Sequence, residues 1–84
     1  MQVIIIGRES PECDDMEANV LEALKKLDIT DATIEHVEDI REEIEVFGVT
    51  KTPALVVEGT LVTEGEVPTA MEIVRMIEDA EYTA

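Results

Sequence analysis

The stretch GRESPEC, residues 7–13, places a hydroxyl and a thiol three positions apart, at Ser10 and Cys13. Cys13 is the only cysteine of the chain. A thiolate is the nucleophile of sulfur chemistry, and unpaired N–H groups at a helix N-terminus stabilise it. Ser10 has the residue type of an N-cap, and Pro11 suits the first helical position, so we expect a helix to begin here. The hydroxyl of Ser10 gains no comparable activation, and it cannot form a disulfide.

Both residues also have simpler interpretations. Serine is a preferred N-cap, so Ser10 needs no chemical role. Cys13 shares a helical stripe with Met16, Val20 and Leu24, where a free cysteine acts as a small buried hydrophobe. The acidic residues around Cys13 disfavour a thiolate further. The local sequence therefore leaves a reactive thiol and a packing residue as alternatives.

Hydrophobic periodicity predicts the elements that position this loop. A run of β-branched residues over 2–6 predicts a buried strand, and apolar spacing predicts a helix from Pro11 to Leu27. The pattern then predicts a weaker, edge-like strand near 32–36 and a helix over 39–47. It predicts a hairpin that turns at Glu58-Gly59 and a last helix over 69–77. The order β-α-β-α-β-β-α predicts an α/β fold with a mixed four-stranded sheet and three helices on both its faces. At this length, residues 1–84 are expected to form a single domain.

Two segments together resemble the thioredoxin family. SPEC follows a strand and opens a helix, where thioredoxins carry Cys-x-x-Cys, and FGVTKTPALVV, residues 47–57, resembles the thioredoxin segment that leads through a proline into a strand. TEGEVPTAMEI resembles the passage from hairpin to last helix. The chain is therefore similar to the small archaeal and bacterial glutaredoxin-like redox-active disulfide proteins, whose minimal thioredoxin fold has the predicted order of elements.

The resemblance implies roles for six residues. Ser10 takes the position of the attacking cysteine and Cys13 that of the resolving one, so they are the candidate catalytic pair. Thr52 and Pro53 resemble the cis-proline pair that faces the redox loop, and with Pro11 and Glu12 they are the candidate substrate-binding residues. The implied activity is the reduction of protein disulfides, with electrons from a thiol reductant or a reductase and no cofactor. Because Ser10 replaces a sulfur, the chain as written is expected to be inactive or impaired.

The composition limits the classes of molecule that we expect as partners. The net charge of −15 repels phosphate backbones and anionic lipids, so neither nucleic acid nor membrane is an expected partner. This acidity fits a strongly solvated surface, or steering toward a basic protein. His36, the only histidine, is expected on a strand surface, and no spacing of residues suggests a metal site. No targeting signal or membrane span is seen, and a lone cysteine gives no sign of secretion, so the expected location is the cytoplasm.

Two other functions stay open. A non-catalytic module could use the groove between SPEC and TPA to hold an extended peptide. A monothiol enzyme could use Cys13 with an external thiol, although the helical stripe directs this residue into the core.

Overall fold

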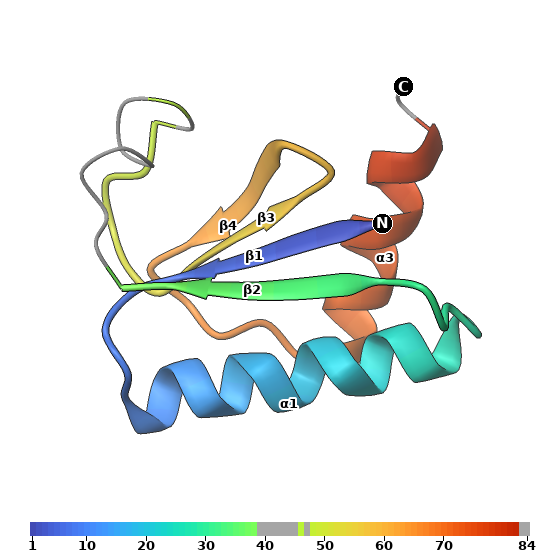
Figure 1. The fold of residues 1–84 in the computed structure, drawn as a ribbon, viewed down its shortest axis with the longest axis horizontal. Coiled ribbons are helices and arrows are strands. Elements are labelled where there is room, and N and C mark those ends of the chain that lie inside the picture. The colour runs from blue at the N-terminus through green and yellow to red at the C-terminus, as the bar shows by residue number, and fades with distance from the viewer. Residues whose placement is uncertain (39–45, 47, 83–84) are drawn as a thin grey trace.

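The computed structural model describes residues 1–38, 46 and 48–82. Its elements follow in the order β1, α1, β2, β3, β4 and α3 (Figure 1). Their bounds are β1 Gln2–Ile6, α1 Pro11–Lys26, β2 Thr33–Val37, β3 Ala54–Val57, β4 Thr60–Glu64 and α3 Ala70–Tyr82. Neither α1 nor α3 combines the length and the apolar character that a membrane-spanning helix needs.

The four strands form one mixed sheet in the order β2-β1-β3-β4. β1 pairs in parallel with β2, which explains why a helix connects them, and it pairs antiparallel with β3. β3 and β4 form the antiparallel hairpin. The mixed four-stranded sheet and the edge position of β2 are thus confirmed.

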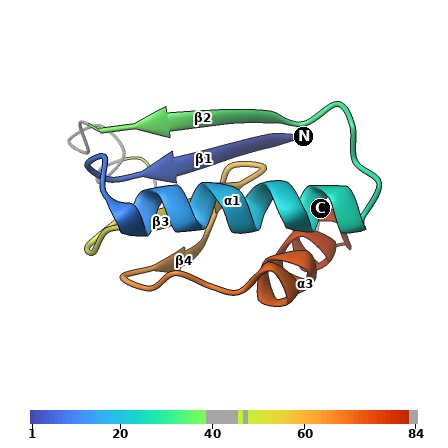
Figure 2. The same ribbon diagram turned by 90° about the horizontal axis from the view of Figure 1, so that it is seen from below.

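β1 lies inside the sheet and is buried on both faces, as its run of β-branched residues predicts. Val3 and Ile5 belong to one core cluster together with residues of α1 and α3. Ile4 and Ile6 belong to a second cluster on the opposite face. Both described helices therefore cover the same face of the sheet, as Figure 2 shows.

The structure describes two helices, whereas the sequence predicts three. The missing one is the helix expected over residues 39–47, and apart from Val46 these residues lie outside the described part of the chain. The two described helices, α1 and α3, pack on one face of the sheet, so a helix on the other face stays a prediction that the described residues do not test.

The hairpin turns at Glu58 and Gly59, whose φ angles are 51° and 79°. Two consecutive residues with positive φ are typical of a type I′ turn, whose twist matches that of the flanking strands. The turn places the end of β4 opposite the start of β3, with Glu64 paired to Ala54. This register brings Glu64 close to the segment that precedes Pro53.

The N-terminus of α3 carries the capping box that Thr69 and Glu72 predict. The hydroxyl of Thr69 accepts a hydrogen bond from the Glu72 N–H at 3.2 Å, and the Glu72 carboxylate accepts from the Thr69 N–H at 3.2 Å. Two N–H groups at the helix end thus gain partners, which stabilises the start of the helix.

We expect Thr69→Ala to lower the free energy of unfolding by about 1 kcal/mol, since it removes the capping hydroxyl. Thr69→Ser keeps the hydroxyl and serves as the matched control. Urea denaturation of the three proteins measures the difference. Equal losses for the two variants would show that the hydroxyl does not stabilise α3.

Candidate functional site

Ser10 is the N-cap of α1, as predicted. Its backbone is extended, with φ −163° and ψ 165°, and Pro11 begins the helix. The Cys13 N–H donates to Ser10 Oγ at 3.2 Å, and the Asp14 N–H donates to the Ser10 carbonyl at 3.0 Å. The Ser10 side chain therefore serves as the N-cap acceptor of α1.

Cys13 is buried, with 4% of its surface exposed, and it packs on the apolar side of α1 together with Met16 and Val20. Its Sγ donates a hydrogen bond to the Arg8 carbonyl at 3.1 Å. The thiol thus points back toward the loop that connects β1 to α1.

Gly7 is the point where the two predicted halves of the site meet. A methyl group on this residue would lie 3.3 Å from Cys13 Sγ, 3.3 Å from Thr52 Cβ and 3.5 Å from Pro53 Cα. The φ of Gly7 is 145°, a conformation that residues with a side chain rarely adopt. The structure therefore brings Cys13 and Thr52-Pro53 together beside the same glycine, although 39 positions separate Cys13 from Thr52.

The sheet explains this meeting. Ile6 is the last residue of β1 and pairs with Ala54, the first residue of β3, so the residues just beyond these strand ends are neighbours. Thr52 is exposed and Pro53 is buried, and the peptide bond between them is cis. The Pro53 carbonyl accepts a hydrogen bond from the Gly65 N–H at 2.9 Å.

The other two predicted binding residues lie on the first turn of α1. Pro11 and Glu12 are both exposed there, next to Ser10. The exposed part of the site therefore consists of this turn and Thr52, while Cys13 and Pro53 lie beneath the surface.

Sequence reasoning missed Glu64, which holds the segment before Thr52. Its carboxylate accepts from the Thr50 N–H at 2.9 Å and from the Thr50 hydroxyl at 3.0 Å. The Thr50 N–H is the main cause of a pKa for Glu64 below its usual 4.5, and the Thr50 hydroxyl adds to it. Counting residues outward from the Glu58-Gly59 turn would have placed Glu64 near this segment.

Sequence reasoning also missed the contact of His36. The side chain is exposed on β2, as expected, but its Nε2–H donates to the Gly7 carbonyl at 2.9 Å. The signal that could have found it is the parallel pairing of β1 with β2, which sets His36 opposite Ile5.

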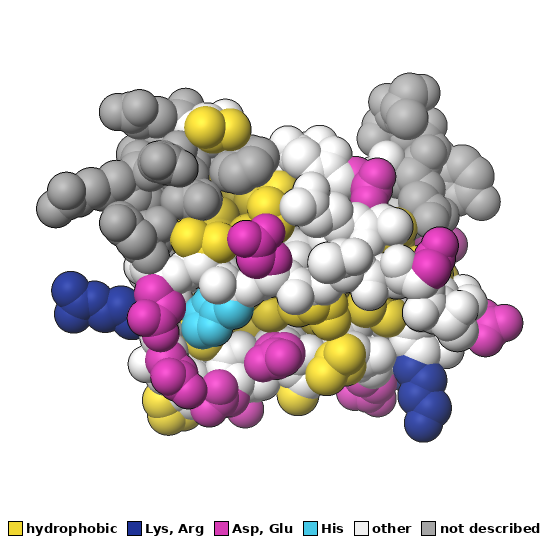
Figure 3. Space-filling view, in the orientation of Figure 1, with side chains coloured by type: hydrophobic (Ala, Val, Ile, Leu, Met, Phe, Trp, Pro, Cys, Tyr) yellow, Lys and Arg dark blue, Asp and Glu magenta, His cyan; other side chains and the backbone are white. Residues whose placement is uncertain are grey.

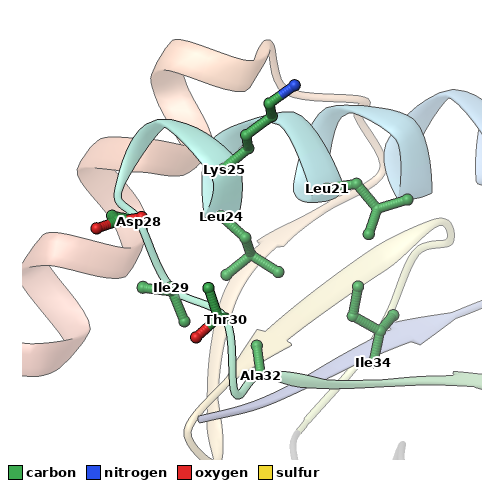
Figure 4. A pocket seen from close by; sticks show the side chains of 8 residues that line it. All are labelled: Leu21, Leu24, Lys25, Asp28, Ile29, Thr30, Ala32 and Ile34. Atoms are coloured by element: carbon green, nitrogen blue, oxygen red, sulfur yellow. The ribbon is translucent and has the colours of Figure 1, made fainter.

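A cavity of about 310 Å³ lies elsewhere, between the second half of α1 and β2 (Figure 4). Leu21 and Leu24 extend from the helix toward Ala32 and Ile34, while Lys25 points away from the sheet. This cavity contains none of the six predicted site residues. Within residues 1–38, 46 and 48–82, no three His, Cys, Asp or Glu side chains form a group that could hold a metal ion.

The chemistry open to this arrangement follows from its one sulfur. The helix N-terminus at residue 10 would stabilise a thiolate, but it meets a hydroxyl that stays protonated at neutral pH. Because Cys13 is the only cysteine, the chain as written cannot form an internal disulfide.

A family model described as a thioredoxin domain matches residues 1–78. The matched range contains the whole sheet, the Ser10–Cys13 turn and the Thr52-Pro53 pair. No curated protein matches the chain.

We expect Gly7→Ala to lower the free energy of unfolding by about 1–3 kcal/mol for the strained backbone, and further because the new methyl crowds Cys13 and Thr52. Gly59→Ala is the matched control, since Gly59 also has a positive φ but nothing lies within 4 Å of its added methyl. Urea denaturation compares the two. A loss at Gly7 no larger than at Gly59 would mean that crowding at this position has no cost.

The hydrogen bonds to Glu64 predict a pH dependence. A pKa lowered in the folded state means that the unfolded chain binds this proton more tightly, so stability is lost as the pH falls. The gap in stability between the parent and Glu64→Gln should be complete above the ordinary pKa of 4.5 and close as the pH falls through the lowered value. Urea denaturation from neutral to acid pH measures it, with exposed Glu66→Gln as the control. A gap that does not change with pH would contradict the prediction.

Proposed function

The chain belongs to the thioredoxin domain family. We propose that it is a glutaredoxin-like thiol–disulfide oxidoreductase that acts on protein disulfides, and that Ser10 occupies the position of the attacking residue. As written, the chain then has little or no dithiol exchange activity of its own. Its partners are an extended protein segment that contains a disulfide, and a thiol reductant or reductase. The proposed location is the cytoplasm.

One observation carries this proposal: Cys13 and Thr52-Pro53 lie around the same point beside Gly7, where an added methyl group would be 3.3 Å from Cys13 Sγ and 3.3 Å from Thr52 Cβ. A substrate bound beside exposed Thr52 would thus lie against the first turn of α1, where Ser10 caps the helix. Thr52 offers its backbone to the extended segment, Pro53 forms the wall behind it, and Pro11 and Glu12 line the approach.

The reaction can be written for a sulfur at position 10. A thiolate there attacks one sulfur of the substrate disulfide, forming a mixed disulfide and releasing the other substrate sulfur as a thiolate, which takes up a proton. Cys13 loses its proton and attacks the sulfur of residue 10, so the first substrate sulfur also leaves as a thiolate. The substrate gains two electrons, and the enzyme keeps an internal disulfide that the reductant must reopen.

A second candidate is a module that binds an extended peptide without reacting with it. The burial of Cys13 and the hydrogen bond of its thiol to the Arg8 carbonyl favour this candidate, since both keep the one sulfur away from a partner. The exposed binding residues do not depend on the identity of residue 10. The same surface would then hold a peptide through backbone hydrogen bonds at Thr52.

The decisive experiment is Ser10→Cys. Sulfurs at positions i and i+3 of a first helical turn satisfy the Cα separation below about 7 Å that a disulfide needs. We expect the variant to lose both free thiols on mild oxidation, to regain them with a chemical reductant, and to turn over a model disulfide. The parent should form no internal disulfide and should not turn over the model disulfide.

Ser10→Cys combined with Cys13→Ser is the matched control, because it keeps the attacking sulfur and removes the resolving one. We expect this double variant to accumulate a mixed disulfide with the model substrate. If Ser10→Cys forms no internal disulfide and turns over no faster than the parent, the redox proposal fails and peptide binding is favoured.

A further inference from the structure

His36 ends the helix-facing side of β2, and its contact reaches the candidate site. Side chains alternate along a strand, so His36 shares its face with Ile34, which packs against the core formed by α1 and α3. Its ring stays exposed at the surface, as the space-filling view shows for the single histidine, with acidic side chains around it (Figure 3). The ring thus lies between solvent and the loop that follows β1.

The end of β2 holds Gly7 by both of its backbone polar groups. The Gly7 N–H donates to the Val37 carbonyl at 2.9 Å, which extends the parallel pairing one residue beyond β1. The Gly7 carbonyl accepts from His36 Nε2–H, also at 2.9 Å. A backbone as unusual as that of Gly7, with φ 145°, is thereby held on both sides of its Cα.

The residue after Gly7, Arg8, connects this backbone to the Cys13 thiol. The Gly7 carbonyl belongs to the peptide plane that joins Gly7 to Arg8, and the following carbonyl, that of Arg8, accepts the Cys13 S–H at 3.1 Å. Only φ and ψ of Arg8 separate the two peptide planes, so fixing the Gly7–Arg8 peptide limits the directions that the Arg8 carbonyl can take. The His36 ring opposes rotation of this peptide because it holds the Gly7 oxygen.

We propose that His36 is a positioning residue that restrains the Cys13 thiol: its ring N–H fixes the Gly7–Arg8 peptide, so that the Arg8 carbonyl keeps the thiol proton and the loop stays closed over the sulfur. This positioning role rests on the proposed function, because the group that His36 restrains is the resolving thiol of that function. Opening of this loop is then the event that makes Cys13 available. His36 acts through the backbone of Gly7, whose carbonyl accepts its hydrogen bond.

The test measures how fast uncharged iodoacetamide alkylates Cys13 in the native protein, at low urea concentrations where global unfolding is negligible. Removing the ring in His36→Ala should raise the rate about fivefold, the ratio that corresponds to the loss of one hydrogen bond worth about 1 kcal/mol. His36→Gln keeps an N–H donor and should return the rate to within about twofold of the parent. Thr33→Ala, an exposed substitution elsewhere on β2, should leave the rate unchanged.

Urea denaturation of the same four proteins separates positioning from simple stability. Losing the hydrogen bond lowers the global stability of His36→Ala as well, but opening of the loop alone exposes little surface, so the alkylation rate of this variant should change little with urea concentration, whereas a rate governed by global unfolding should rise with it. An unchanged rate in His36→Ala would overturn the proposal. So would equal acceleration in His36→Ala and His36→Gln, or an alkylation rate that rises with urea concentration as steeply as global unfolding does.

The alkylation experiment uses the parent thiol and does not depend on redox activity. If Ser10→Cys proves inactive while His36→Ala still exposes Cys13, the redox function fails and the positioning role stands. If Ser10→Cys is active and His36→Ala changes nothing, the positioning role alone fails.

Discussion

The close packing at Gly7 is the constraint on which the rest of the site depends. The Cys13 sulfur and Thr52 Cβ approach this residue so closely that a methyl group would crowd both. Such an approach requires a residue without a side chain, in a backbone conformation that glycine adopts without cost. The ends of β1 and β3, the first turn of α1 and the end of β2 all converge there, so the site is defined by where three strands and a helix meet.

Ser10 meets a requirement of the backbone that does not depend on the chemistry of its side chain. A helix N-terminus needs an acceptor at the N-cap, and the hydroxyl of Ser10 supplies one to the Cys13 N–H. The same N–H groups would stabilise a thiolate, so either side chain satisfies the backbone. Folding therefore does not require a sulfur at residue 10, although disulfide exchange does. Cys13 differs, because it is buried on the apolar side of α1 whatever its chemical role.

Apolar packing stabilises this fold, and charge contributes little. The described residues bury no charged or polar side chain, and the core is built from Val, Ile, Leu, Met and Ala. The carboxylates therefore lie at the surface, where an ion pair such as Lys26 with Glu22 at 3.9 Å contributes at most about 1 kcal/mol. An exception of local importance is Glu64, whose two hydrogen bonds from Thr50 order the segment before Pro53.

The sequence by itself determined the parts of this protein that depend on residues close along the chain. The Ser10 N-cap, the Thr69 capping box and the Glu58-Gly59 turn involve partners at most four positions apart, so residue type and spacing are enough to predict them. The strands and the two described helices follow from hydrophobic periodicity, and the burial of Cys13 follows from its helical stripe. The helix expected over 39–47 falls outside the described residues.

Only the tertiary structure decided that His36 holds Gly7, 29 positions away, and that Glu64 holds Thr50, 14 positions away. These contacts depend on strand register and on the direction of individual side chains, which become defined only when distant segments pack together.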